Sequence, residues 1–311
     1  MMEKLIVSSS PHIRSSVTTQ KIMLDVIIAL LPASIAAVVL FGLRALLLIA
    51  VSVVTAVLSE FIFNLICKKK QTVGDLSAVV TGLLLALNLS TKVTVWQTIV
   101  GAIFAIIVVK CLFGGIGCNF ANPAITARVM MLIAFGQVAG GASTAFAEIE
   151  AGATPLAILG GEAGSLPSYI DMLLGNRGGA IGETCIIALV LGFIYLVARR
   201  VIHWQTPVIF IGTVFVLSFL LCGFDASVAL YHVLSGGLFL GAIFMATDYS
   251  TTPTNSLGKM VFALGCGIIT VLIRFYGDYP EGVSFAILFM NILAPYIEGW
   301  TARRPFGGAK K

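Results

Sequence analysis

Long apolar segments alternate with short polar connections over most of the chain. A transmembrane helix needs about 20 apolar residues to cross the roughly 30 Å hydrocarbon core of a bilayer. Two of the segments, Gly74–Leu89 and Ala121–Phe135, are short for a full crossing, which favours broken or re-entrant helices. The pattern predicts ten segments in two sets of five: Ile22–Gly42, Ala45–Cys67, Gly74–Leu89, Gln97–Phe113 and Ala121–Phe135, then Ile181–Ala198, Pro207–Cys222, Ala229–Ala246, Met260–Phe275 and Val283–Glu298.

The composition excludes a soluble domain. Hydrophobic residues make up 59% of the 311 residues and charged residues 11%, whereas soluble domains carry about a quarter charged residues. The net charge of +5 is modest and bears on membrane orientation, so no nucleic-acid partner is expected. The six cysteines include no C-x-x-C pair. We expect them to be small buried apolar residues. Their spacing indicates neither a metal site nor a disulfide framework, and a metal centre shared with another subunit stays open.

Basic residues predict the orientation of an all-α polytopic membrane protein. If the amino terminus is cytoplasmic and ten segments alternate, 15 of the 19 basic residues lie on the cytoplasmic side, as the positive-inside rule expects. Both termini are then cytoplasmic. The polar start has no cleavage site, so the first segment is expected to be an uncleaved anchor. The predicted units are a cytoplasmic arm (1–21), a first five-helix repeat (22–135), an extracytoplasmic loop (136–180), a second five-helix repeat (181–299) and a cytoplasmic tail (300–311).

The two sets of five segments echo each other. Each third segment is rich in glycine, and the fifth segments pair Asn122 with Pro123 and Asn291 with Pro295. An odd number of segments per set makes the sets inverted repeats, which place a polar site near the membrane midplane. On this hypothesis the third and fifth segments of both sets are interrupted or short. Chance similarity between apolar helices is the alternative that the pattern alone leaves open.

One short stretch, Ala151–Leu156, lies in the long polar interlude between the two sets. Its Thr154 is suited to cap the amino end of a helix, and Pro155 to occupy the first helical position, where its missing N–H costs nothing. For an isolated stretch of this kind, a helix start is the ordinary interpretation.

Five ordered motifs resemble those of one family. Residues 114–124 (GGIGCNFANPA) are similar to its G-G-x-G-x-N-x-x-N-P-A signature. The others are SPH at 10–12 with MLDV at 23–26 and ALLPA at 29–33, GET at 182–184, MATD at 245–248, and MNILAP at 290–295 followed by RP at 304–305. By these motifs the chain resembles the D-type membrane subunit of the Rnf electron-transport complex, a sibling of the B-type membrane subunit of the sodium-pumping NADH:quinone reductase.

The resemblance implies a fold and a function. The fold is ten transmembrane helices in two inverted five-helix repeats, similar to urea and ammonium channels. The function is that of a membrane electron-transfer subunit in an ion-translocating ferredoxin:NAD⁺ oxidoreductase of the bacterial inner membrane. The implied partners are the other Rnf subunits, among them a second FMN-carrying subunit and iron–sulfur subunits. Na⁺ and H⁺ both stay open as the translocated ion.

The resemblance also implies a covalent flavin. In the family the threonine of a G-A-T stretch carries FMN through a phosphoester, which places the cofactor on Thr154 with Gly152 and Ala153 beside it. The family pattern is usually S-G-A-T, and here Ala151 replaces the serine, while Thr154 keeps the hydroxyl that forms the ester. A second, non-covalent flavin, riboflavin, is associated with such subunits. Because a flavin carries the electrons, no side chain is assigned a catalytic role.

Polar residues in or beside the apolar segments are further candidates. Ionisable groups inside a membrane are expensive, so each is a functional hypothesis. Asp248, in an oxygen-rich stretch before a proline, is expected to hold a cation or a flavin hydroxyl. Asn119 and Asn122 complete the candidate cofactor set, although asparagines here are expected chiefly to satisfy backbone groups freed at helix breaks, as is Asn291. The acids are Asp25, Glu60, Asp75, Glu183, Asp248 and Glu298, of which Asp75 and Glu298 also fit an interfacial helix end.

Two alternatives belong beside the flavin-bearing subunit. A solute channel or transporter of the same fold would share the helices, because a fold does not determine a function. The G-A-T-P stretch in an outer loop favours the flavin hypothesis over that one. The sibling quinone-reductase subunit usually has a longer amino-terminal arm, so the short polar stretch before Ile22 favours the Rnf interpretation.

Overall fold

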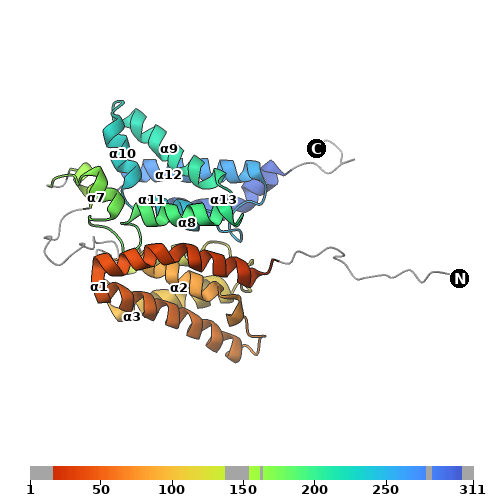
Figure 1. Cartoon of the computed structure of the whole chain (residues 1–311). Helices are drawn as coiled ribbons and strands as arrows, with labels where there is room; N and C mark the ends of the chain where they lie inside the picture. Colours follow the sequence, from red (N-terminus) through yellow and green to blue (C-terminus); the bar gives the residue numbers. More distant parts are fainter. Residues whose placement is uncertain (1–16, 137–153, 162–163, 278–281, 303–311) are drawn as a thin grey trace, which may run out of the picture.

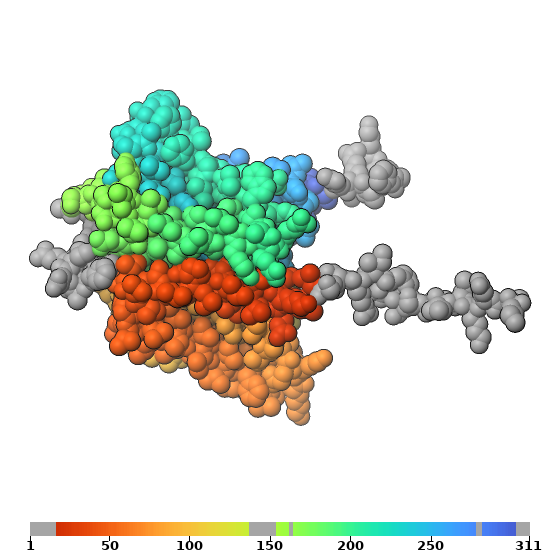
Figure 2. All heavy atoms as spheres, in the orientation of Figure 1, coloured from red at the N-terminus to blue at the C-terminus, as the bar shows by residue number. Residues whose placement is uncertain are grey.

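The protein is a bundle of helices in two groups. The computed structural model describes residues 17–136, 154–161, 164–277 and 282–302, and in these ranges it contains no strand. The first half of the chain forms one group and the second half the other, and they meet along the middle of the molecule (Figures 1 and 2). The elements are α1 (Thr19–Ile66), η1 (Val73–Asp75), α2 (Ser77–Leu87), α3 (Val95–Ile103), the π-helical η2 (Phe104–Cys111), α4 (Pro123–Phe135), α6 (Pro155–Leu159), α7 (Tyr169–Leu174), α8 (Ile186–Ala198), α9 (Gln205–Leu221), α10 (Ala226–Leu234), α11 (Leu238–Leu240), the π-helical η3 (Gly241–Met245), α12 (Ser256–Tyr276) and α13 (Val283–Thr301).

The helix α1 contains the first two apolar segments. Its 48 residues would extend about 70 Å at 1.5 Å per residue, far more than one membrane crossing. Gly42 has φ 69° and ψ −160°, a conformation that glycine adopts without steric cost. The chain reverses there, and Figure 1 shows the second arm turning back from the first. The polar gap between the two predicted segments is therefore a hairpin turn.

Length and composition identify membrane helices among the described residues. Three helices, α1, α12 and α13, are long and apolar enough to cross a membrane, and the bent pair α10 with α11–η3 makes a fourth. Large apolar side chains also point outward from the bundle, as Val39 (68% exposed) and Leu65 (62%) do on α1. An apolar exterior of this kind fits lipid rather than water.

The third segment of each half is interrupted or short, as the pattern predicts. In the second half, α10 and the α11–η3 helix meet at a bend of 63°, beside Gly236 at φ 67°. In the first half, α2 has only 11 residues and begins after Leu76, whose φ is 63°. Both breaks leave helix ends that other groups must satisfy.

The prediction for the fifth segments is right for one half and wrong for the other. The helix α4 is short, with 13 residues, but α13 runs for 19 residues without a break. Pro295 lies inside α13. A proline removes one intrahelical hydrogen bond, here to the carbonyl of Asn291, and the remaining bonds and the packing keep the helix continuous.

Corresponding helices pack across the middle of the molecule. The helix α1 packs against α8, and α4 packs against α13, so the first and fifth segments of each half meet their counterparts. One apolar core runs through both halves, with Leu30, Leu85, Phe210 and Phe262 fully buried. The start of α1 and the end of α13 lie at one end of the bundle, whereas α7 and α10 lie at the other (Figure 1).

Candidate functional site

A cavity opens near the end of the bundle where α1 begins. Its empty volume is about 740 Å³, a figure that includes the open solvent at its mouth. Its walls come from both halves of the chain. The lining residues are Ile22, Met23, Val26, Ser77, Val80, Thr81, Leu84, Lys110, Ile116, Asn119, Asn122, Pro123, Leu196, Val201, Ile202, Phe244, Thr247, Asp248, Tyr249 and Ser250.

Asn119 and Asn122 both line this cavity but differ in role. The Asn122 side-chain oxygen caps α4, accepting from the backbone N–H groups of Ala124 (3.0 Å) and Ile125 (3.4 Å), which confirms its expected structural role. The Asn119 side-chain oxygen is buried and has no hydrogen-bond partner in the described part of the chain. A buried acceptor without a donor costs free energy. The Asn119 oxygen is therefore the cavity group that a ligand with a hydrogen-bond donor would satisfy.

Asp248 also lines the cavity, from the turn after η3. Its carboxylate accepts hydrogen bonds from the Ser250 backbone N–H (3.1 Å), the Ser250 hydroxyl (3.0 Å) and the Thr251 hydroxyl (3.2 Å). Burial raises the pKa of Asp248, and these hydrogen bonds oppose that shift. The main role of the Asp248 carboxylate is therefore to stabilise its own turn by hydrogen bonds, although it also lines the cavity.

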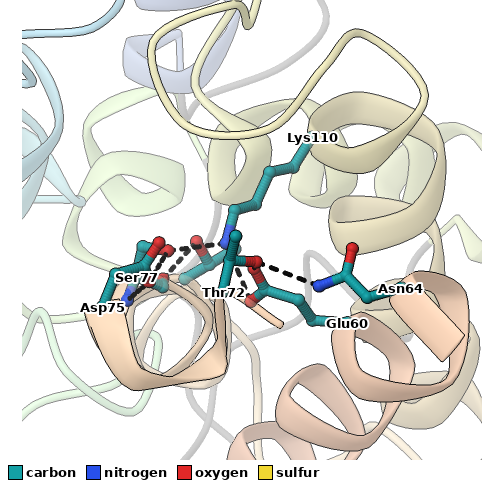
Figure 3. Close-up of polar contacts among 7 residues, drawn as sticks. Glu60, Asn64, Thr72, Asp75, Ser77 and Lys110 are labelled. Carbon is teal, nitrogen blue, oxygen red and sulfur yellow. Dashed lines mark hydrogen bonds and ion pairs between the residues drawn. The ribbon is translucent and has the colours of Figure 1, made fainter. Parts of the chain in front are cut away.

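A buried ion pair joins α1 to η2 (Figure 3), and its lysine lines the cavity. Lys110 Nζ of η2 is 2.9 Å from Glu60 Oε2 of α1, and both side chains are 2% exposed. The same ammonium donates to the Ser77 hydroxyl at 2.6 Å, and the Ser77 hydroxyl donates to Asp75 at 2.5 Å. Thr72 donates to the other Glu60 oxygen at 2.6 Å. The first half of the chain thus holds a connected polar network between two apolar segments.

Thr154 lies in a different region. Its side-chain oxygen caps α6 by accepting from the Ala157 backbone N–H at 3.1 Å, and Pro155 takes the first helical position, so the predicted helix start is confirmed. The Thr154 side chain is partly exposed. The helix α6 packs against α10, at the end of the bundle away from the start of α1 (Figure 1). Gly152 and Ala153 fall outside the described residues.

Comparison with known proteins identifies the family. A family model described as "NQR2, RnfD, RnfE family" matches residues 6–307. The chain belongs to this family. It is 46% identical over 310 residues to the D subunit of the Na⁺-translocating ferredoxin:NAD⁺ oxidoreductase complex of Acetobacterium woodii, covering 98% of this chain and 96% of the relative. It is 39% identical to the D subunit of the proton-translocating complex of Clostridium ljungdahlii (97% and 96% covered) and 32% identical to that of an ion-translocating complex of Methanosarcina acetivorans (99% of each). The resemblance to the D-type membrane subunit is confirmed.

The motifs that carry the NQR2, RnfD, RnfE resemblance lie in different parts of the described structure. The GGIGCNFANPA and MATD motifs, far apart in sequence, contribute Asn119, Asn122 and Asp248 to one cavity. The GET motif lies elsewhere: Glu183 is buried, and its carboxylate accepts from the Ala180 backbone N–H at 3.0 Å. The structure therefore divides the predicted cofactor residues into a cavity group and a Thr154 group.

The remaining membrane acids have structural partners. Asp25 of α1 accepts from the Tyr195 hydroxyl (2.9 Å) and from Arg199 (3.3 Å), joining α1 to the end of α8. Glu298 accepts from the Thr254 hydroxyl at a helix end. Within the described ranges, no three His, Cys, Asp or Glu side chains are grouped so that they could hold a metal ion.

Sequence reasoning missed Lys110. Lys110 is among the 15 basic residues that the predicted orientation places on the cytoplasmic side, and the sequence indicates Glu60 as a membrane acid without indicating its partner. A signal was present: Glu60 is the only charged residue of the predicted segment Ala45–Cys67, and Lys110 the only one of Gln97–Phe113. Opposite charges in two nearby apolar segments predict an ion pair, because each is costly to bury alone.

Proposed function

We propose that the chain is the membrane electron-transfer subunit of an Rnf-type ion-translocating ferredoxin:NAD⁺ oxidoreductase. The observation that carries this proposal is the alignment along nearly the whole length with relatives named as the D subunit of such complexes. Those names specify Na⁺ for one relative and protons for another, so the proposal extends to ion translocation and not to a particular ion. The partners are the other subunits, including a second FMN-carrying subunit and iron–sulfur subunits.

The proposal places FMN on Thr154 through a phosphoester. Support comes from the hydroxyl itself, which is partly exposed and held at the start of α6. Pro155 has no N–H that could donate to the Thr154 hydroxyl oxygen. The hydrogen bond from the Ala157 N–H occupies one of the two lone pairs of that oxygen. The bound flavin would supply one-electron chemistry that no side chain provides. Thr154 would hold it, and Gly152 and Ala153 would leave space around the phosphate.

We also place a non-covalent flavin, riboflavin, in the cavity. Ile22, Val26 and Phe244 offer apolar walls for a planar ring. The unpartnered Asn119 oxygen would accept a hydrogen bond from ring or ribityl groups, and Thr247 adds a hydroxyl to the lining. Pockets of this kind are mostly apolar with a few polar groups that fix orientation.

The proposal includes two inverted five-helix repeats. The matched contacts of α1 with α8 and of α4 with α13 support it. So does a parallel between the fourth segments, in which a basic side chain reaches the break of the third segment. Lys110 bonds Ser77 at the start of α2, and Arg274 donates to the carbonyls of His232 and Ser235 at the end of α10.

The basic residues support a sidedness for this arrangement. With 15 of 19 assigned to the cytoplasm, the cavity faces inward and Thr154 outward, in the bacterial inner membrane. The two flavins would then stand on opposite sides. The channel alternative is disfavoured because the halves pack closely between these regions: Asn88 Nδ2 lies 3.5 Å from Met245 Sδ, both buried.

The proposal is tested by purifying the intact complex through a tag on this chain. We expect ferredoxin:NAD⁺ oxidoreductase subunits to copurify, one FMN to stay with this chain after denaturation, and riboflavin to be released. A chain that purifies alone and without flavin, and that transports a solute in vesicles, would contradict the proposal.

A further inference from the structure

The Glu60–Lys110 ion pair is a buried charged group that the proposed function does not use. The two residues are 50 positions apart and come from α1 and η2. A buried ion pair contributes little net stability, because desolvation offsets the attraction. An ionisable pair inside a membrane protein is therefore a candidate for a functional role. Because Lys110 lines the cavity, that role is expected to involve the cavity ligand.

Lys110 faces the cavity with donor capacity to spare. The ammonium has three N–H donors, and the structure gives it two acceptors, Glu60 and Ser77. Lys110 also lines the cavity. A bound ligand that acquires negative charge can thus attract this ammonium over a short movement of a flexible side chain.

Glu60 is connected to the surface on its other side. The Thr72 hydroxyl donates to Glu60 Oε1 at 2.6 Å and accepts from Asn64 Nδ2 at 3.0 Å, and Thr72 itself is exposed. Figure 3 shows Thr72 between Asn64 and Glu60, so a residue that is exposed contacts the buried carboxylate. The titratable groups gathered around the pair are Asp75, Cys67, Lys69 and Cys111.

We propose that Lys110 and Glu60 form a charge switch for the cavity ligand. The inference rests on the flavin proposed above for the cavity. When that flavin gains one electron from a redox partner, its ring becomes an anion, and the Lys110 ammonium turns from Glu60 toward it. Glu60, now buried without its cation, favours its neutral form and takes one proton from water through Thr72.

The switch keeps the charge of the site constant. One electron enters the flavin and one proton enters the Glu60 carboxylate, and no bond forms between the protein and the ring. On reoxidation, the electron passes to the next redox centre, the proton returns to water, and Lys110 pairs with Glu60 again. Lys110 and Glu60 are thus positioning residues whose effect appears in the pH dependence of the flavin potential.

The test is a redox titration of the non-covalent flavin in the purified complex. For one proton per electron, the potential of the wild type should fall by about 59 mV per pH unit, while the absorption spectrum shows an anionic ring. Glu60→Gln keeps an acceptor for Thr72 but cannot take up a proton, so this dependence should vanish. Lys110→Met should lower the potential. Glu298→Gln is the matched control, because Glu298 also accepts from a threonine hydroxyl but lies outside the network.

Two outcomes would overturn the switch while leaving the cavity flavin in place: a neutral reduced ring in the wild type, or an unchanged pH dependence in Glu60→Gln. A complex that contains no non-covalent flavin overturns the cavity assignment, and the switch with it. A further measurement uses the wild type alone. The infrared difference spectrum of wild type on reduction should show a newly protonated carboxyl group, and its absence also rejects the switch.

Discussion

Asn291 of α13 is hydrogen-bonded to Asn122 at the start of α4. With its amide oriented to satisfy both neighbours, its oxygen accepts from the Asn122 backbone N–H (3.1 Å), and its nitrogen donates to the Thr251 carbonyl (3.2 Å). Asn291 is 1% exposed. One side chain therefore ties together the two asparagine–proline motifs and the turn that carries Asp248.

Asn291→Leu should remove this connection. Leucine has a similar size but leaves the Asn122 N–H and the Thr251 carbonyl unsatisfied, which costs about 1–3 kcal/mol for each buried polar group. We expect a lower unfolding temperature of the purified complex and a loss of cavity flavin. Ile292→Ala, at a neighbouring side chain that is 51% exposed, is the control and should change both much less. Equal effects of the two substitutions would argue against the bridge.

The two cavity asparagines should respond differently to alanine. Asn122→Ala removes a helix cap and should lower stability by about 0.5–2 kcal/mol. Asn119→Ala removes an oxygen that has no partner in the described structure, so stability should hold while non-covalent flavin is lost. Thermal unfolding and flavin content, measured on the same preparations, separate the two effects. Full flavin content in Asn119→Ala would remove this residue from the site.

The hairpin turn of α1 should depend on glycine. Gly42 has φ 69° and ψ −160° with open space around it, so Gly42→Ala meets no neighbour but costs about 1–3 kcal/mol, because this backbone conformation is adopted almost only by glycine. Gly212→Ala is the matched control: that glycine also has open space, but it lies within α9, where alanine favours the helix by about 1 kcal/mol. Unfolding temperatures should move in opposite directions. A neutral Gly42→Ala would show that the turn is not constrained.

Local sequence signals predicted local structure well. The apolar segments located the helices, and T-P correctly marked the helix start at Thr154, because a cap and the first turn involve adjacent residues. The pairing of Lys110 with Glu60 depends on how segments 50 residues apart pack, so the single charge in each segment indicates a pair but not its geometry or its place at the cavity. The position of Asn119, Asn122 and Asp248 at one cavity depends on the same kind of packing. The intact α13 shows that tertiary packing can outweigh the effect of a single proline.

Reporter fusions test the sidedness that the basic residues predict. A reporter that is active only outside the cytoplasm should work when it is fused near Glu162 and should be silent after Lys311. Fifteen of the 19 lysines and arginines fall on the cytoplasmic side in this orientation, which is the bias that membrane insertion follows. The reverse pattern of activity would place Thr154 in the cytoplasm and overturn the arrangement of the two flavins.

Thr154→Val tests whether this hydroxyl carries FMN. Valine is close to threonine in shape but has no nucleophilic oxygen, so the protein should insert and assemble while electron transfer by the complex falls. Its loss of the cap on α6 costs about 1 kcal/mol, too little to prevent folding of the bundle. Thr154→Ser keeps an oxygen and should be labelled weakly. Thr144→Val, at a threonine in the same predicted outer loop, is the control and should keep its flavin.

The intact mass of this chain, taken from cells that make its flavin transferase, is the most direct measurement of the central claim. We expect the wild type to exceed its sequence mass by one FMN minus one water and to fluoresce after denaturation, with both signals absent in Thr154→Val. A wild-type chain at its bare sequence mass, or a Thr154→Val chain that retains the added mass, would contradict a flavin bound at Thr154.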